Sequence, residues 1–172
     1  MNEVIKCLTD RRSVKSYSDR MVEDEKIAQI VEAGKYAPCG MGMQATMMVV
    51  VKDAKTVKML SEMNAKVMGA QKDPFYGAPV VIVVFADTER STYVEDGSLV
   101  MGNLLNAAHS VGVDSCWIHR AREVFAGEEG MALKEKWGVP DRYAGIGNCI
   151  LGYGDKEYPR AKSRKEDFVI YV

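Results

Sequence analysis

The sequence lacks the patterns of a membrane protein, a secreted protein or a metal site. Its longest apolar run, residues 78–86, is less than half of the ~20 residues that a membrane helix needs. Its four cysteines include no C-x-x-C pair, so neither a zinc site nor a redox dithiol is indicated. The N-terminus has no apolar signal-peptide core, and Glu3 and Asp10 argue against a transit peptide. These absences predict a soluble, cytoplasmic protein with reduced thiols.

An excess of charge of one sign is also missing. The chain has 23 lysines and arginines against 24 aspartates and glutamates, and its pI is near 6.2. This balance provides no broad positive field for DNA or RNA. The 172 residues are 47% hydrophobic and 27% charged, which is ordinary for a globular protein and long enough for one core. Because no repeat or linker divides the chain, we expect a single domain, residues 1–172.

Against this neutral background, basic residues gather near both ends of the chain. Residues 11–15, Arg-Arg-Ser-Val-Lys, combine guanidinium, hydroxyl and ammonium donors that suit a phosphate dianion. A second cluster contains Arg160, Lys162, Arg164 and Lys165. Isolated basic runs are more often solvated surface, so the functional interpretation requires the fold to bring the clusters together. In that case the chain contains an anion site.

Hydrophobic periodicity predicts alternating helices and strands. Helical patterns begin after Asn2, near Glu23, after Asp53, at Thr92 and at Glu128, and strand-length apolar runs cover residues 46–51, 80–85, 115–118, 146–151 and 168–172. The run at 80–85 is unbroken, which is typical of a strand covered on both faces. The small residues of the long helix at 92–111 suit either a subunit interface or a central helix of the same chain. This order predicts an α+β fold, a three-layer α/β/α sandwich.

Two further segments carry functional alternatives. Residues 38–44, Pro-Cys-Gly-Met-Gly-Met-Gln, form a loop whose two glycines would let the backbone approach a flat ligand, although a flexible connection has the same composition. The apolar segment 168–172 has no partner strand nearby in the sequence. An unpaired apolar strand favours aggregation, so we expect it to be exchanged between two-fold-related subunits.

Five short motifs occur in the order found in a known family. They are residues 11–15 after the first helix, Ala37-Pro38 with Gln44 at the end of the loop, Ala78-Pro79 before the Val-rich strand, Gly112-Val113-Asp114 before Trp117-Ile118, and Gly152 leading to Lys162 and Arg164. With these motifs the chain resembles the FMN-dependent nitroreductases, in particular their short members, over essentially its whole length. Each motif alone is weak, and their order makes the resemblance specific.

The resemblance implies a central mixed, largely antiparallel sheet and a homodimer with FMN at the subunit interface. It implies that the FMN phosphate is held by Arg11, Ser13, Lys162 and Arg164, with Arg12 and Lys15 flanking the ribityl chain and the ring edge. The partner's loop would pack on the flavin through Pro38, Cys39, Gly40, Met41 and Gln44. The other face of the ring would be lined by Trp117, Ile118, His119 and Arg120. No metal is expected.

The resemblance also implies an enzyme in which NADH or NADPH reduces FMN and a nitroaromatic, quinone or similar small molecule reoxidises it. Because the cofactor carries the chemistry, few polar side chains are expected near the reacting atom, and the sequence identifies no catalytic residue. The alternative is a binding module that holds FMN or another phosphorylated ligand without turnover. Neither hypothesis involves nucleic acid or a membrane.

The sequence departs from the family pattern at two places. Family loops often carry Ser after the Pro, Asn two residues before the Gln, and Pro-Trp after it; this chain has Cys39, Gly42 and Ala45-Thr46. His119-Arg120 stands where an acidic residue followed by Gly is common. We therefore expect one amide contact to be missing or moved, and a more cationic pocket than usual.

Overall fold

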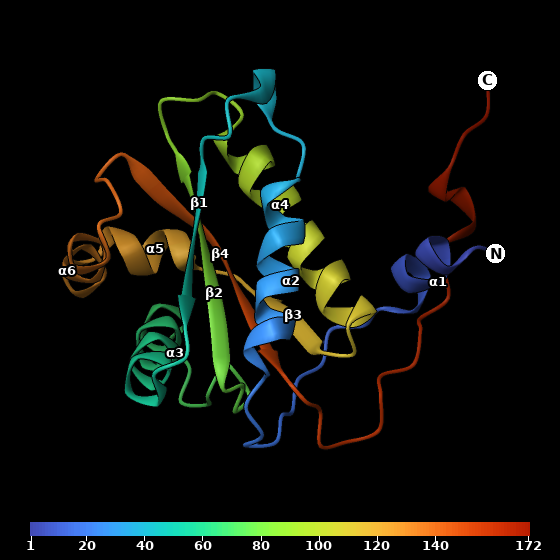
Figure 1. Cartoon of the computed structure of the whole chain (residues 1–172), viewed down its shortest axis with the longest axis horizontal. Coiled ribbons are helices and arrows are strands. Elements are labelled where there is room, and N and C mark those ends of the chain that lie inside the picture. The colour runs from blue at the N-terminus through green and yellow to red at the C-terminus, as the bar shows by residue number, and fades with distance from the viewer.

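A four-stranded antiparallel sheet lies at the centre of the computed structural model, which describes all residues, 1–172 (Figure 1). Its strands, in spatial order, are β1 (Thr46–Val51), β2 (Val80–Asp87), β4 (Tyr143–Gly152) and β3 (Asp114–Ile118). All neighbouring strands pair antiparallel. Ser13 adds one isolated parallel bridge to Ser115 at the outer edge of β3. The prediction of a central, largely antiparallel sheet is confirmed.

Helices cover both faces of the sheet and complete the predicted sandwich. One face is covered by α2 (Asp24–Lys35) and α4 (Tyr93–Ser110), and the other by α3 (Ala54–Met68), α5 (Ala121–Ala126) and α6 (Glu128–Trp137) (Figure 1). Successive residues of a strand point to opposite faces, so β2 contributes to two apolar cores. Val81 and Val83 join the core under α3, whereas Ile82 and Val84 join the core under α2 and α4. Every residue of β2 is buried, which confirms the run at 80–85 as a central strand.

One small residue of α4, Gly97, brings this helix onto the sheet. A Cβ atom added at Gly97 would lie 2.5 Å from Cγ1 of Ile146 in β4, so only glycine permits this approach. A Cβ at Gly102 would meet nothing within 4 Å. At Gly97 the long helix therefore acts as a central helix of its own chain, one of the two predicted alternatives. At Gly102 its surface is open in the single chain.

The helix α1 (Glu3–Asp10) lies outside the sandwich, at the end of α4 (Figure 1). Its predicted cap is confirmed, because Asn2 Oδ1 accepts a hydrogen bond of 2.9 Å from the Ile5 N–H. No residue of α1 is buried, and Val4, Ile5 and Leu8 present an apolar surface to solvent. None of the helices combines the length and the apolar character that a membrane span requires.

The C-terminal segment forms no strand in the single chain, contrary to the pattern of residues 168–172. A short 3-10 turn, η2 (Glu166–Phe168), is followed by exposed apolar residues that run away from the sheet (Figure 1, red). The pattern indicates strand propensity, but a strand also needs an edge with which to pair. Exchange of this segment with a second subunit stays a prediction.

A polar cluster ties the end of β4 to the start of α2. The Tyr153 hydroxyl donates to Glu23 Oε2, and Arg20 Nη2 donates to Glu23 Oε1 at 2.6 Å. The Arg20 guanidinium also stacks 4.0 Å above the Tyr153 ring. Hydrogen bonds to a carboxylate favour its ionised form. The bond from Tyr153, together with that from Arg20, lowers the pKa of Glu23 to about 2.

Glu23→Gln is expected to lower stability in a pH-dependent way. The folded pKa of about 2 lies below the ordinary 4.5, so the carboxylate stabilises the fold above about pH 4.5, and this contribution is lost as the pH falls toward 2. Melting temperatures of wild type and variant should therefore differ at neutral pH and converge between pH 5 and 2. Glu32→Gln, which removes only a surface pair with Lys35, is the control. A difference that stays constant over this range would contradict the prediction.

Candidate functional site

The basic segment 11–15 lies along the outer edge of β3. It follows the C-terminus of α1 directly, and the Val14 N–H donates to the Ser115 carbonyl at 3.1 Å. Residues then alternate in exposure as in a strand: Ser13 and Lys15 are exposed, whereas Val14 is buried in the core under α3. The hydroxyl of Ser13 and the ammonium of Lys15 are therefore both available to a ligand.

Arg11, Ser13 and Lys15 of the basic segment all influence one thiol, that of Cys116. Burial raises the pKa of Cys116 in β3, while the hydroxyl of Ser13 and the charges of Lys15 and Arg11 act in the opposite direction. Arg11 is half-buried, and its guanidinium has no acidic partner within 4.0 Å. A partly desolvated guanidinium without an anion is a favourable place for one.

Arg12 has a different local role from its neighbours. Its Nη1 donates to the carbonyls of Thr9 at 2.7 Å and Arg11 at 2.8 Å, so the side chain folds back over the end of α1. Its Nε is buried without a partner. Cations near a helix C-terminus stabilise the unpaired carbonyls there. In the single chain Arg12 therefore caps α1, and its contact with the ribityl chain stays a prediction.

Tyr158 joins the C-terminal segment to the basic segment. The Arg12 N–H donates to the Tyr158 hydroxyl at 2.8 Å. The same hydroxyl lies 3.3 Å from His109 Nδ1 of α4, and the two rings stack at 6.0 Å. These contacts hold the C-terminal segment near α1, just before the second basic cluster in the sequence (Figure 1).

The second basic cluster remains open in the single chain. Arg160 pairs with Glu157 at 3.2 Å and Lys165 with Asp167 at 3.7 Å. Lys162 and Arg164 are exposed and make no hydrogen bond or ion pair. These are the two members of the cluster predicted to hold the phosphate. Nothing in the single chain ties them to Arg11, so the two-sided clamp stays a prediction.

The loop 38–44 lies at the opposite end of α2 from the segment that joins α1 to α2 (Figure 1). It contains the short turn η1 (Gly40–Gly42) and three left-handed residues, Met41 (φ 55°), Gly42 (φ 65°) and Gln44 (φ 51°). Left-handed φ in residues other than glycine costs about 1–3 kcal/mol and gathers at functional sites. The Met41 side chain is 94% exposed. Within one chain this loop and the basic segment do not meet.

The end of β3 is fixed by two buried amides. Asn64 Nδ2 donates to the His119 carbonyl at 2.7 Å, and Asn148 Nδ2 donates to the Ile118 carbonyl at 3.3 Å. Arg120 then adopts a left-handed conformation, with φ 73°, before α5 begins. Neither asparagine was singled out from the sequence. The available signal was an amide at a position where the helix and strand patterns place apolar side chains.

The four predicted ring-face residues point in different directions from this strand end. Trp117 packs against α4 and β4, where a Cβ added at Gly147 would lie 2.6 Å from the indole Nε1. Ile118 is buried on the opposite face, in the core under α3. The His119 side chain is exposed and that of Arg120 half-buried, and neither makes a hydrogen bond or an ion pair. Only the backbone is common to all four positions.

The residues around β3 fit the phosphate end of FMN. The donor set of Arg11, Ser13 and Lys15 contains no competing carboxylate, and charge-assisted donors of this kind bind phosphate strongly. Beside them, Ser115 Oγ is buried and has no hydrogen-bond partner, although buried polar atoms are normally satisfied. An unpaired buried hydroxyl on the residue that pairs with Ser13 is consistent with a polar ligand at this edge.

Comparison with known proteins decides the family. The nitroreductase family model matches residues 8–154. The chain belongs to the nitroreductase family. An Archaeoglobus fulgidus protein, provisionally named NADH dehydrogenase/NAD(P)H nitroreductase, is 36% identical over 172 residues, which cover 95% of this chain and 94% of the relative.

Solved nitroreductase structures share the fold over the whole chain. A nitroreductase with bound FMN from Desulfitobacterium hafniense has a TM-score of 0.89 and 28% identity, covering 100% of this chain and 99% of that chain. One from Bacteroides fragilis, also with bound FMN, has a TM-score of 0.92 at 24% identity and covers 100% of both chains, which supports the fold. The nitroreductase fold predicted from the sequence is confirmed.

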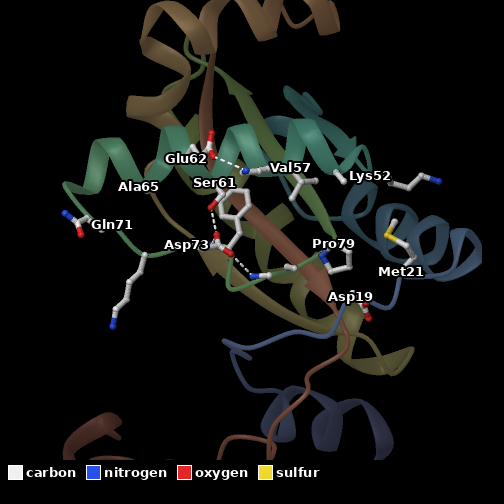
Figure 2. A pocket seen from close by; sticks show the side chains of 16 residues that line it. Asp19, Met21, Lys52, Val57, Ser61, Glu62, Ala65, Gln71, Asp73 and Pro79 are labelled. Atoms are coloured by element: carbon white, nitrogen blue, oxygen red, sulfur yellow. Dashed lines mark hydrogen bonds and ion pairs between the residues drawn. The ribbon is translucent and has the colours of Figure 1, made fainter.

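A cavity of about 650 Å³ lies elsewhere, between α3 and residues 71–79 (Figure 2). None of the residues predicted to hold FMN lines it. Its apolar floor includes Val57 and Phe75, and the Asp73 carboxylate at its edge accepts from the Ser61 hydroxyl and from the Phe75 and Gly77 N–H groups. These bonds order the turn before β2. The cavity is therefore separate from the candidate nitroreductase site.

Proposed function

We propose that this nitroreductase is an FMN-dependent NAD(P)H oxidoreductase that reduces nitroaromatic, quinone or related small-molecule acceptors. The observation that carries the proposal is that the segment 11–15 runs along the outer edge of β3 and presents Arg11, Ser13 and Lys15 there, with no acidic partner for either cation. FMN is bound in solved nitroreductases of this fold, and a 92-residue stretch is 39% identical to a Bacillus subtilis FMN reductase [NAD(P)H]. Bound FMN would supply hydride transfer at its N5 atom.

The protein's own residues would bind and orient the cofactor. Arg11 and Ser13 would hold the phosphate from one side, and Lys162 and Arg164 of the C-terminal segment from the other. Arg12 and Lys15 would lie toward the ribityl chain and the ring edge. The backbone of residues 117–120 would line one face of the ring, held in place by the amides of Asn64 and Asn148.

The other face of the ring would be covered by the loop 38–44 of a second subunit. The loop lies at the far end of α2 from its own basic segment, so a contribution in trans is the economical arrangement (Figure 1). A homodimer would also cover the apolar residues that the single chain exposes, among them Val4 and Leu8 of α1 and the segment 168–172. We further propose that residues 1–172 form one cytoplasmic FMN-binding domain, since both cores share one sheet.

Strand exchange would use the free edge of β1. The outer edge of β3 already pairs with residues 13–14, whereas β1 pairs only with β2. The segment 168–172 of one subunit would therefore extend the partner's sheet next to β1, satisfying backbone groups that are unpaired at an edge. Both the edge and the segment are apolar, which suits an obligate interface.

Anaerobic mixing of the flavin-loaded protein with NADH or NADPH tests the proposed function. We expect the flavin absorbance near 450 nm to bleach within seconds and to return when menadione or a nitroaromatic is added. The rival function, an FMN-binding module without turnover, predicts a yellow protein that neither nucleotide bleaches. Dithionite provides the control, because it reduces bound flavin in both cases.

A further inference from the structure

Asp96 is a buried carboxylate outside the set of residues assigned to the flavin site. It lies in the first turn of α4, and its side chain is almost completely buried, with 4% exposure. Its Oδ1 accepts the Gly40 N–H at 2.9 Å, and its Oδ2 accepts the Thr92 hydroxyl at 3.1 Å. Burying a carboxylate costs folding free energy unless hydrogen bonds satisfy its oxygens. The two groups that donate to Asp96 therefore indicate what it does. One of these partners belongs to the loop 38–44.

The bond between Gly40 and Asp96 is the only hydrogen bond that joins residues 38–44 to another element of the chain. The other bonds of the loop are internal: Gly42 to the Cys39 carbonyl, Met43 to the Gly40 carbonyl, and the Gln44 N–H to Cys39 Sγ at 3.3 Å. Internal bonds maintain a turn but do not fix its place on the protein. Asp96 therefore anchors the turn to α4.

The packing at Gly40 supports the same conclusion. A Cβ added at Gly40 would lie 2.4 Å from Thr92 Oγ1, so the backbone of the loop rests directly on the residue that also donates to Asp96. Glycine at position 40 is required by this close approach. The backbone of the loop at Gly40, the Thr92 hydroxyl and the Asp96 carboxylate are thus all in mutual contact.

We propose that Asp96 is a positioning residue of the nitroreductase site, which holds the loop 38–44 in the conformation that covers the partner's flavin. This inference rests on the proposed function, because the loop is assigned to the flavin there. The left-handed residues 41, 42 and 44 would otherwise relax to commoner conformations. Fixing the loop before FMN binds reduces the ordering cost of binding.

Asp96→Ala is expected to raise the Kd for FMN about tenfold, because only the fraction of molecules with a correctly placed loop binds well and this fraction falls to about one tenth. The visible circular dichroism of the bound flavin, which reports on groups packed against the ring, should change as well. The matched control is Glu95→Ala, which removes the neighbouring carboxylate; Glu95 is exposed and forms no hydrogen bond. Its Kd and spectrum should equal those of the wild type.

Two further variants separate positioning from charge and from misfolding. Asp96→Asn keeps an oxygen acceptor for the Gly40 N–H, so it should restore the Kd to within about threefold of wild type, which is under 1 kcal/mol. If the negative charge near the α4 N-terminus were what matters, this variant would bind as weakly as Asp96→Ala. Gly40→Ala leaves the core carboxylate intact but displaces the loop from Thr92, so it should weaken FMN binding and alter the spectrum like Asp96→Ala.

The outcomes distinguish this inference from the proposed function. A wild-type protein that binds no FMN would overturn the proposed function. Wild-type binding, together with unchanged Kd and unchanged flavin spectrum in both Asp96→Ala and Gly40→Ala, would overturn the positioning role alone. Equal losses of FMN affinity in Asp96→Ala and Asp96→Asn would overturn the positioning role in favour of a charge effect.

Discussion

Replacing Arg11 by alanine is expected to weaken FMN binding by about 1.5 to 3 kcal/mol, the range for a hydrogen bond to a charged group, which raises the Kd about 10- to 150-fold. The reason is the position of Arg11: its guanidinium is half-buried and lacks an acidic partner, so a phosphate would be its only counter-ion. Arg164→Ala should have an effect of the same size, because the clamp needs donors from both ends of the chain. Fluorescence titration of FMN measures both variants.

Arg160→Ala is the matched control for the second basic cluster. Arg160 belongs to the same segment as Arg164 but already pairs with Glu157 at 3.2 Å. An exposed ion pair of this kind contributes little, so the variant should bind FMN nearly as well as the wild type. If affinity stays within about threefold in both Arg11→Ala and Arg164→Ala, the phosphate is held elsewhere.

Deletion of residues 168–172 is expected to abolish the stable dimer and with it flavin binding. The five residues are exposed in the single chain and apolar, and the edge of β1 is free to receive them from a partner. Losing them would remove a strand from each sheet and the trans contribution of the loop 38–44. Light scattering after size exclusion, combined with the absorbance at 450 nm, measures mass and flavin content together.

The control for this deletion is Val169→Ile, which preserves length and apolar character. It should remain a yellow dimer. Ile170→Asp, which places a charge in the middle of the segment without shortening it, should behave like the deletion. A stable yellow monomer obtained from the deletion would show that the segment is not needed for the site.

The sequence predicted the sheet and most helices because their patterns are long and local. The run at 80–85 is apolar at every position. The strand in the structure, β2 (Val80–Asp87), begins at the same residue and ends slightly later. The helix α5 was not predicted, since six residues are too few for a periodic pattern. Residues 168–172 form no strand in the single chain, because pairing depends on an edge that the local sequence does not specify; their pairing with a partner subunit stays a prediction.

The site was predictable to the extent that it depends on motifs. The donors at residues 11–15 were singled out by residue type alone, and the structure places this segment along the outer edge of β3; their role as phosphate ligands stays a prediction. The two-sided clamp, in which both basic clusters hold one phosphate, stays a prediction. Asp96, Asn64 and Asn148 were missed for a common reason: each acts through a backbone group far away in sequence. A pattern of side-chain types does not reveal the partner of a backbone N–H or carbonyl.

The proposed pairing of the exposed C-terminal segment with the free β1 edge of a partner would set the order of assembly. Residues 3–152 contain all four strands and both cores, so the sandwich can fold as a monomer before the segment finds an edge. Capture of flavin would then be the last event, and its rate would rise with protein concentration because it waits for a bimolecular encounter. A newly made chain at low abundance would pass through a colourless, fully folded stage whose lifetime is set by the supply of identical chains.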